Sequence, residues 1–257
     1  MASKLSTRKR PDRDVKMLTE RQHKFSERAF DDPTIRTLKF LISNRVFSSL
    51  DFPIQHGKEA AVYRATREAG EGKEYLAVKI FKYEGPSFQK RVQYMEGDKR
   101  FDVPKNKRAL VRTFARKEYA NLKILEEGGV HVPKPVKQRD NIVVMEFLGE
   151  GGMPSALLKD VVLEDAEKTL SAILSDMKKM NRARIVHVDL SEYNVIIHKG
   201  EPFIIDVGQA VLTHHPQAEE FLQKDLMHIL KYFGKEGVEI DKEKASKYIK
   251  GESSTYR

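Results

Sequence analysis

Alternating apolar and polar residues predict a group of β-strands in the first 150 residues of the chain. The segment from Ile54 to Ala65 alternates on both sides of a turn at Gly57, and residues 74–81 alternate without interruption. Period-two alternation is typical of strands with one buried face. Apolar runs predict two more strands, at residues 130–137 and 141–147. The first half of the chain is therefore predicted to hold a small β-rich region.

Apolar residues spaced three and four apart predict helices before and after these strands. One helix ends at Gly128-Gly129 and has a core-facing stripe formed by Phe114, Glu118, Leu122 and Leu125. An earlier helix is predicted to begin with Asp32 as its N-cap and Pro33 as its first residue. Helical spacing covers residues 32–47, 163–177 and 218–233. Strands followed by helices indicate an α+β fold.

A short hairpin in the second half carries the most informative polar residues. Residues 195–197 and 203–205 are apolar and flank a turn that contains Gly200 and Pro202. Asn194 precedes the first strand and Asp206 follows the second, so the hairpin is predicted to bring both side chains together. Asp189 lies five residues before Asn194, within reach of the same point.

These three side chains match the needs of phosphoryl transfer from ATP. Asp189 would accept the proton of the attacking hydroxyl, while Asn194 and Asp206 would hold magnesium against the nucleotide phosphates. The alternative is a chance match among ordinary loop acids, because the pattern H-x-D-x4-N is short. His187, which opens the pattern, is expected to pack and to hydrogen-bond rather than to titrate.

A lysine in an apolar strand adds a second part of such a site. Lys79 lies within the strand predicted at residues 74–81, where an unpaired ammonium would be costly to bury. Glu118 lies on the core-facing stripe of the next helix and is its natural partner. This strand-lysine and helix-glutamate pair is what a kinase nucleotide site requires. An isolated lysine of this kind would more often be a snorkelling residue of an edge strand.

Six motifs occur in a fixed order along the chain: Gly57–Tyr63, Glu96–Phe101, Arg116–Leu122, Val144–Gly149, Asp189–Asn194 and Ile205–Val211. Together they resemble the RIO atypical protein kinases, over roughly residues 40–233. The sequences Glu-Gly-Asp-Lys-Arg-Phe and Asp-Val-Gly-Gln-Ala-Val resemble the type 1 RIO branch. The resemblance implies a two-lobed protein-kinase-like fold, with an extra N-terminal helix on the β-rich lobe and no activation segment or peptide-docking helices.

The same resemblance implies a binding site for ATP and magnesium, with manganese as an alternative ion. It assigns catalysis to Asp189 and Asp206, and metal binding to Asn194 and Asp206. Residues implied to bind the nucleotide are Ile54, Gly57, Lys58, Val62, Ala77, Lys79, Glu118, Met145, Glu146 and Leu148. It also implies that Asp225 hydrogen-bonds the backbone of the catalytic loop, the alternative being a surface acid paired with Lys224 or Lys231.

Two positions depart from the RIO pattern. The nucleotide loop reads Gln55-His56-Gly57 where the family has Ser-Thr-Gly, which removes a serine contact to phosphate. Val188 stands where the family usually has glycine after the catalytic-loop histidine. A valine there predicts a backbone that does not need the conformational freedom of glycine.

Composition agrees with a cytoplasmic enzyme. The chain has 257 residues, no cysteine and a net charge of +9, and it has no apolar run of the ~20 residues that a membrane span needs. Residues 1–28 hold nine Lys or Arg against four acids and are predicted to form a basic, partly disordered arm. Such an arm is either a solvated tail or a contact for nucleic acid. The RIO resemblance favours contact with a maturing small ribosomal subunit, protein and rRNA included.

The predicted domains are the arm at 1–28, a β-rich lobe at 29–148 and a helical lobe at 149–257. Within the first lobe, residues 84–110 are highly charged and longer than an ordinary connection, so a mobile loop is predicted. Ser87 and Thr113 flank this loop as candidate phosphoacceptors.

Three functions fit the sequence. The first is a RIO-type serine protein kinase and ATPase that autophosphorylates and acts, as a monomer or weak dimer, in small-subunit maturation. The second is a small-molecule phosphotransferase of the aminoglycoside or choline kinase type, which shares the H-x-D-x4-N loop. The third is a pseudokinase, and the presence of all five polar site residues argues against it.

Overall fold

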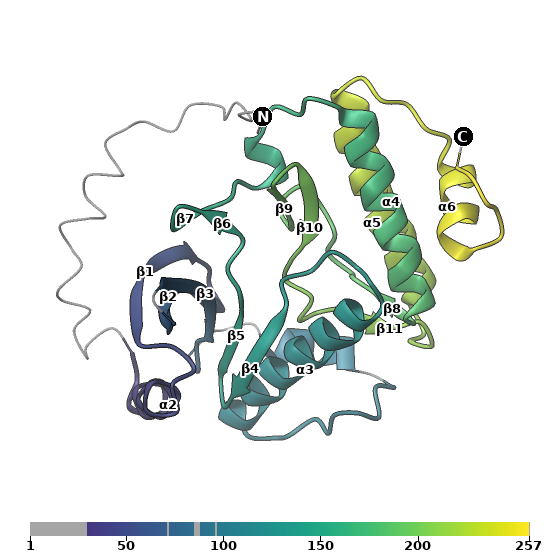
Figure 1. Ribbon diagram of the computed structural model, residues 1–257. Helices are drawn as coiled ribbons and strands as arrows, with labels where there is room; N and C mark the ends of the chain where they lie inside the picture. The colour runs from purple at the N-terminus through teal and green to yellow at the C-terminus, as the bar shows by residue number, and fades with distance from the viewer. Residues whose placement is uncertain (1–29, 71, 85–87, 96, 257) are drawn as a thin grey trace.

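A five-stranded antiparallel sheet forms the first lobe of the computed structural model (Figure 1), which describes residues 30–70, 72–84, 88–95 and 97–256. The strand order is β1-β2-β3-β5-β4. The strands are β1 (Ser49–His56), β2 (Ala60–Ala69), β3 (Gly72–Phe81), β4 (Pro135–Arg139) and β5 (Ile142–Glu146). The strands expected from alternation are all present. The basic arm at 1–28 and Ser87 lie outside the described residues.

The two faces of this sheet are covered by different helices. Leu76, Val78 and Ile80 of β3 pack in one cluster with Leu38 and Leu41 of α2 (Asp32–Ser43). The alternate residues of β3 join the larger core on the opposite face, together with α3 (Lys107–Glu127). Because side chains alternate along a strand, Lys79 points to the α3 side. The sheet is thus buried on both faces.

Helix α2 differs slightly from its prediction. Its N-cap is Asp31 rather than Asp32, and the Asp31 carboxylate accepts a hydrogen bond from the Thr34 N–H at 2.8 Å. The helix ends at Ser43 rather than Phe47. Phe47 is still buried, in the cluster between α2 and the sheet. The apolar pattern therefore predicted burial correctly but overran the helix end.

The second lobe is mainly helical. Its helices are α4 (Ala166–Arg182), α5 (Ala218–Lys235) and α6 (Lys242–Lys250), and α4 packs against both others (Figure 1). The hairpin of β9 (Val195–His198) and β10 (Glu201–Ile204) has the expected antiparallel register. Short elements complete the lobe: β6 (Gly149–Glu150), β7 (Met153–Pro154), η3 (Leu158–Asp160), β8 (Ile185–Val186) and β11 (Val211–Leu212). Among the described helices, none is long and apolar enough to span a bilayer.

The charged segment after β3 has structure that its composition did not predict. A 3-10 helix, η2, covers Phe88–Met95, and α3 already begins at Lys107. Asn106 caps α3 by accepting hydrogen bonds from the N–H groups of Arg108 and Ala109. Thr113 is buried within α3, and its hydroxyl donates to the Ala109 carbonyl. Thr113 is therefore not an accessible phosphoacceptor in this fold, which corrects that expectation.

Candidate active site

The ammonium group of Lys79 joins carboxylates from both lobes. Its Nζ atom lies 2.8 Å from Oε1 of Glu118 on α3 and 2.8 Å from Oδ1 of Asp206, which follows β10. The side chain of Glu118 is nearly fully buried, whereas that of Asp206 is 44% exposed. Three of the residues chosen from the sequence are thus in direct contact, although 127 positions separate the outermost two.

Burial and neighbouring charges shift the pKa values of the three clustered residues in different directions. Burial lowers the pKa of Lys79, but the carboxylates of Asp206 and Glu118 together raise it above its ordinary value. The Lys79 ammonium holds the pKa of Asp206 below its usual range. Burial raises the pKa of Glu118 in spite of Lys79, and its Oε2 atom has no hydrogen-bond partner among the described residues. At neutral pH Lys79 is therefore charged and Asp206 is a carboxylate, the states needed to bind phosphate and metal.

Helix α3 also holds the chain that follows Asp206. Lys117 donates hydrogen bonds to the carbonyls of Gly208 and Ala210, and Asn121 donates to the Val207 carbonyl at 2.9 Å. A Cβ atom on Gly208 would lie 3.0 Å from Glu118 Oε2, so the close approach of this loop favours glycine. Sequence reasoning missed Lys117 and Asn121. Lys117 and Asn121 lie four residues apart and therefore share a helix face, but two polar residues at this spacing look like an ordinary solvent-facing surface in the sequence.

The catalytic-loop residues lie next to this cluster. The side chain of Asp189 is exposed. The Asn194 amide nitrogen donates to the Asp189 carbonyl at 2.7 Å, which fixes the Asn194 side chain against the catalytic loop. The Ile205 N–H donates to the Asn194 carbonyl, so the hairpin ties the segment before Asp206 to Asn194.

Asp225 of α5 fixes the backbone of the catalytic loop. Its buried carboxylate accepts hydrogen bonds from the N–H groups of Val188 at 2.8 Å and Leu190 at 2.9 Å, on both sides of Asp189. The contacts implied by the RIO resemblance are present, and a surface ion pair is excluded. His187 Nε2 donates to the Ile205 carbonyl and Nδ1 accepts from the Asp189 N–H, a structural arrangement.

Val188 contradicts one expectation. Its φ is +81°, in the left-handed region that a β-branched residue rarely adopts. Asp206 also has a positive φ, +60°. Such backbone strain costs roughly 1–3 kcal/mol per residue and persists only where surrounding contacts enforce it. The hydrogen bond from Val188 to Asp225 is one of those contacts.

Residues expected around adenine lie on the face of the sheet that carries Lys79. Ala77 pairs with Met145 across β3 and β5, and Val62 pairs with Lys79 across β2 and β3, so these side chains share the face of Lys79. Ala77, Met145 and Leu148 are buried. The Leu148 carbonyl accepts a hydrogen bond from the Ser155 N–H, so its own N–H is the group suited to an adenine edge.

Ile54 and Glu146 are half-buried, at a bulged part of β1 and at the end of β5. The Glu146 carboxylate accepts a hydrogen bond from the Lys134 N–H, and the Glu146 N–H donates to the Lys134 carbonyl at 2.8 Å.

The loop expected to cover phosphates is joined to the charged segment. Gly57 and Lys58 are exposed in the turn between β1 and β2. The next residue, Glu59, forms an ion pair with Arg91 of η2 at 2.5 Å. In the amide orientation that matches donors with acceptors, the Gln209 oxygen lies 3.1 Å from both terminal nitrogens of Arg91. Arg91 therefore connects the phosphate loop to the loop after Asp206, which the sequence did not reveal.

Comparison with known proteins shows which family this chain belongs to. The model of the RIO domain family matches residues 61–246. The chain is 37% identical over 232 residues to the RIO-type serine/threonine-protein kinase Rio1 of Haloferax volcanii, covering 90% of this chain and 79% of that protein. The chain belongs to the RIO1 family of serine/threonine-protein kinases. Rio1 of Methanocaldococcus jannaschii is 34% identical, with 92% and 82% covered. The serine/threonine-protein kinase RIO1 of Caenorhabditis elegans is 37% identical, but this chain spans only 46% of it.

Solved structures show the same fold. The Rio2 kinase-ADP/Mg²⁺-phosphoaspartate complex from Chaetomium thermophilum superposes with a TM-score of 0.64 at 22% identity. The match covers 83% of this chain and 65% of that one. The two lobes of this RIO1 chain therefore form a protein-kinase-like fold. RIO1 membership also favours a protein kinase over the aminoglycoside or choline kinase type.

The donor set of this RIO1 chain fits magnesium bound together with a nucleotide. Magnesium is usually held by one or two protein carboxylates plus substrate phosphates and water, not by an all-protein cage. Asp206 and the Asn194 oxygen would supply two hard oxygen ligands. Among the described residues, no group of three or more His, Cys, Asp or Glu side chains is placed to hold a metal ion.

Proposed function

We propose that the protein is a magnesium-dependent serine protein kinase and ATPase of the RIO1 type. The observation that carries this proposal is the contact of Lys79 with both Glu118 and Asp206. The hairpin ties the segment before Asp206 to Asn194, whose side chain in turn donates to the Asp189 carbonyl. Each of these side chains suits one task in phosphoryl transfer. Family membership supports the reaction class, and the geometry supports the choice of residues.

The nucleotide would lie in the cleft between the lobes. Adenine would be enclosed by Val62, Ala77 and Met145, with its edge facing the backbone of Glu146 and Leu148. Lys79, oriented by Glu118, would bind the phosphates, and the N–H groups around Gly57 and Lys58 would lie over them. Asn194 and Asp206 would hold magnesium, which when bound neutralises charge on the phosphates.

Asp189 would act as the general base. Its exposed carboxylate would accept the proton of a serine hydroxyl, or of water, as that oxygen attacks the γ-phosphorus. The new P–O bond forms as the bond to the bridging oxygen breaks, and ADP leaves. Asp225 keeps the Asp189 backbone in place through the two neighbouring N–H groups.

Asp206 is placed to be a phosphoacceptor as well. A carboxylate oxygen that attacks the γ-phosphorus displaces ADP and leaves an acyl phosphate, which water later hydrolyses to inorganic phosphate. The two steps together amount to ATP hydrolysis. Only eleven residues separate Asp206 from α5, which leaves little chain for a peptide-docking platform. We therefore propose ATP turnover and autophosphorylation as the main outputs, coupled in the cytoplasm to maturation of the small ribosomal subunit.

ATP turnover tests this proposal directly. We expect turnover to require magnesium and to fall at least ~10²-fold in Asp189→Ala, because a positioned general base contributes that much. Glu192→Gln, which removes a carboxylate three residues further along the same loop, is the matched control and should retain activity. Turnover that is equal in Asp189→Ala and wild type would refute the assignment.

A further inference from the structure

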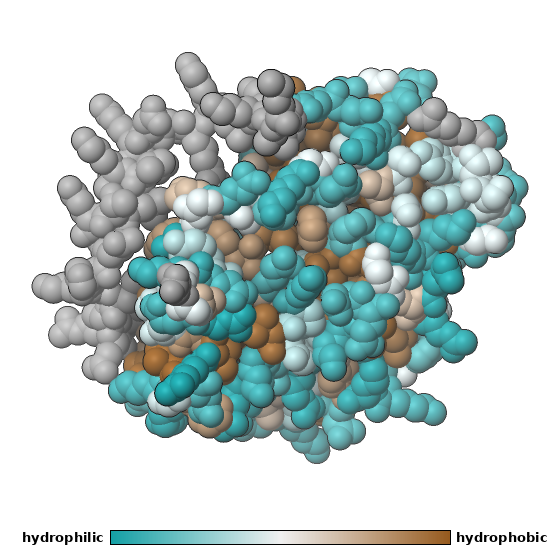
Figure 2. All heavy atoms as spheres, viewed as in Figure 1, coloured by the Kyte–Doolittle hydropathy of each residue, from teal (hydrophilic) through white to brown (hydrophobic). Residues whose placement is uncertain are grey.

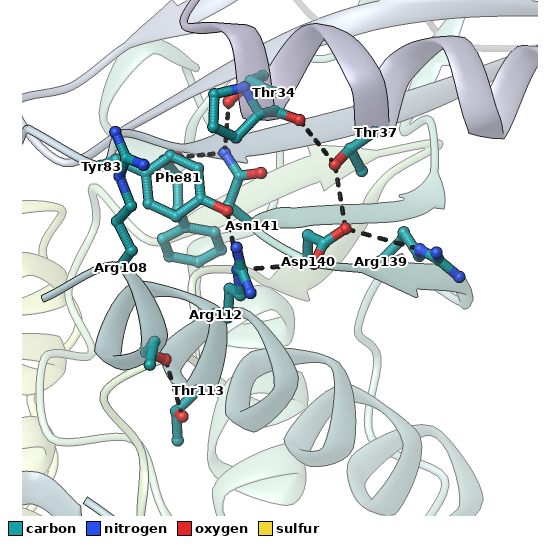
Figure 3. Close-up of polar contacts among 12 residues, drawn as sticks. Thr34, Thr37, Phe81, Tyr83, Arg108, Arg112, Thr113, Arg139, Asp140 and Asn141 are labelled. Carbon is teal, nitrogen blue, oxygen red and sulfur yellow. Dashed lines mark hydrogen bonds and ion pairs between the residues drawn. The ribbon is translucent and has the colours of Figure 1, made fainter. Parts of the chain in front are cut away.

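A small cavity lies outside the proposed active site, where α2 meets the turn between β4 and β5 (Figure 3). Its volume is about 220 Å³. Three arginines, two aromatic rings and one carboxylate contribute to its lining, formed by Pro33, Arg36, Thr37, Phe40, Tyr83, Arg112, Arg139 and Asp140. We call it the arginine pocket. Its residues come from α2, from α3, from the end of β4 with the turn that follows, and from the segment after β3, which is why no single motif revealed it.

Hydrogen bonds hold the floor of the arginine pocket in place. The buried Asn141 amide donates to the Thr34 hydroxyl at 2.9 Å and to the Phe81 carbonyl at 2.7 Å (Figure 3). The neighbouring Asp140 has a φ of +49°, and its carboxylate accepts from the Thr37 hydroxyl at 3.1 Å. Helix α2 is thereby fastened to the β4–β5 turn, so the pocket is preformed.

The arginines of the pocket are only partly neutralised. Arg112 Nε and Arg139 Nε each lie 3.6 Å from a carboxylate oxygen of Asp140, longer than the ~2.7–2.9 Å of a charge-assisted hydrogen bond. Arg36 is exposed and forms no ion pair within the described part of the chain. Three positive charges therefore face one negative charge, and guanidinium N–H groups remain to bind an anion.

Aromatic rings lie beside these charges. The Arg139 guanidinium stacks on Phe40 at 4.0 Å from the ring centroid, and Phe40 is still 38% exposed. On the other side, Arg112 Nε donates to the Tyr83 hydroxyl at 3.2 Å. Arg108 also lies over the Tyr83 ring. Figure 2 shows hydrophobic atoms near α2 among hydrophilic surroundings. The exposed large hydrophobic residues of this helix are Phe40 and Ile42.

We propose that the arginine pocket binds one nucleotide of a single-stranded RNA. The guanidinium groups would bind its phosphate, and the base would stack on Phe40 with Arg139. Unpaired RNA bases are recognised by stacking on aromatic rings and on arginine planes. The cavity is also smaller than the ~300–1,000 Å³ of typical small-molecule sites, which suits one unit of a polymer.

RNA explains the site better than a phosphorylated peptide does. A phosphate group alone would need the arginines but not an exposed aromatic platform. Further basic side chains on the lining elements, Lys39, Lys107, Arg108 and Lys137, extend the positive charge beyond the cavity and suit a continuous backbone. The proposal rests on the part of the proposed function that brings the protein to ribosomal precursor RNA.

Photo-crosslinking locates the site. A 12-nucleotide single-stranded RNA that contains 4-thiouridine would be mixed with the full chain, irradiated and analysed by mass spectrometry. We expect crosslinks in peptides that contain Phe40 or Tyr83. Crosslinks confined to residues 1–28, or to the second lobe, would overturn the proposal. This readout does not depend on ATP turnover.

Affinity of the same RNA, measured by fluorescence anisotropy at several salt concentrations, tests the chemistry. Phe40→Ala should weaken binding about 5- to 150-fold, the effect of losing one stacked base. Arg36→Ala/Arg139→Ala should weaken binding and make the slope of log K against log salt shallower by about 0.7, because the one phosphate in the pocket is no longer neutralised. The matched control, Arg182→Ala/Lys231→Ala, removes two exposed charges from the second lobe and should change neither value.

Two outcomes contradict the proposal. If both double variants lose affinity equally, RNA binds the net charge of the molecule and not this pocket. If a phosphorylated peptide of the same net charge binds more tightly than the RNA and loses that advantage in Phe40→Ala, the occupant is a protein. Whether or not the pocket binds RNA, ATP turnover of Arg36→Ala/Arg139→Ala should equal that of the wild type. A wrong RNA-site proposal can therefore be distinguished from a wrong kinase assignment.

Discussion

Lys79 Nζ lies 2.8 Å from Asp206 Oδ1, so the expected phosphate-binding cation is paired with the expected metal ligand. The pair links β3 of the first lobe to the end of the hairpin in the second. The charges of this pair suit MgATP. The negatively charged triphosphate could replace the Asp206 carboxylate beside Lys79, and Asp206 would then hold the magnesium ion. The lobes are therefore already aligned by the groups that the substrate would engage.

Phosphorylation of Asp206 should be detectable. We expect the protein to take up ³²P from γ-labelled ATP in a form that hydroxylamine releases, because acyl phosphates react with it and phosphoserine does not. Asp206→Asn should abolish this label, while Ser87→Ala in the charged segment should not. Label of this kind that survives in Asp206→Asn would place the phosphoacceptor elsewhere.

Lys117 should give the fold a distinct pH dependence. Burial lowers the pKa of Lys117 from 10.5 to about 7. Between those values the unfolded chain holds a proton that the folded protein lacks, so the free energy of unfolding should rise with pH. The rise is about 1.4 kcal/mol per pH unit.

Urea unfolding between pH 7.5 and 9.5 checks this rise, with Lys117→Met as the comparison. The variant should lack the Lys117 contribution and show a correspondingly flatter profile. Parallel profiles for the two proteins would show that Lys117 keeps its proton in the folded state.

Asp225→Asn should damage both stability and catalysis. An amide has one acceptor oxygen, so the N–H of either Val188 or Leu190 would lose its partner. An unsatisfied buried N–H costs about 1–3 kcal/mol, and the strained Val188 would lose a restraint. We expect lower unfolding free energy and reduced turnover below the unfolding transition. Asp160→Asn, at an acid of the same lobe whose side chain is 41% exposed, should change neither quantity. An Asp225→Asn variant with unchanged stability and turnover would contradict the role.

The Glu59–Arg91 ion pair should restrain the charged segment. Both side chains are partly exposed, so we expect a contribution of only about 0.5–1 kcal/mol. Glu59→Gln and Arg91→Ala should each speed amide hydrogen exchange in residues 91–95 about 2- to 5-fold. The double variant should be no faster than the faster single variant, as for a shared interaction. Additive effects would mean that the two residues act separately.

The sequence predicted the parts of the site that spacing controls. Glu118 was found because it interrupts an apolar helical stripe, and Lys79 because it interrupts an apolar strand. Asn194 and Asp206 were brought together by a hairpin whose turn residues are explicit. In each case a polar residue breaks a regular pattern, and such breaks are readable without coordinates.

Other features of the structure could not be predicted from the sequence, because they depend on tertiary contacts. Lys117 and Asn121 look like surface residues in the sequence, because polar residues on a helix usually face solvent, yet both are buried against the loop after Asp206. The left-handed backbone of Val188 is imposed by Asp225, 37 residues away. The arginine pocket combines four elements. Helix α6 was not predicted, since its apolar residues are few.

Binding of a fluorescent ATP analogue, with and without magnesium, tests the central claim most directly. If Asn194 and Asp206 hold the metal beside the phosphates of the bound nucleotide, magnesium should tighten binding at least about tenfold in the wild type, equivalent to 1.4 kcal/mol. Asn194→Ala and Asp206→Asn should each remove that effect. A magnesium effect of undiminished size in both variants would contradict the site described for this protein.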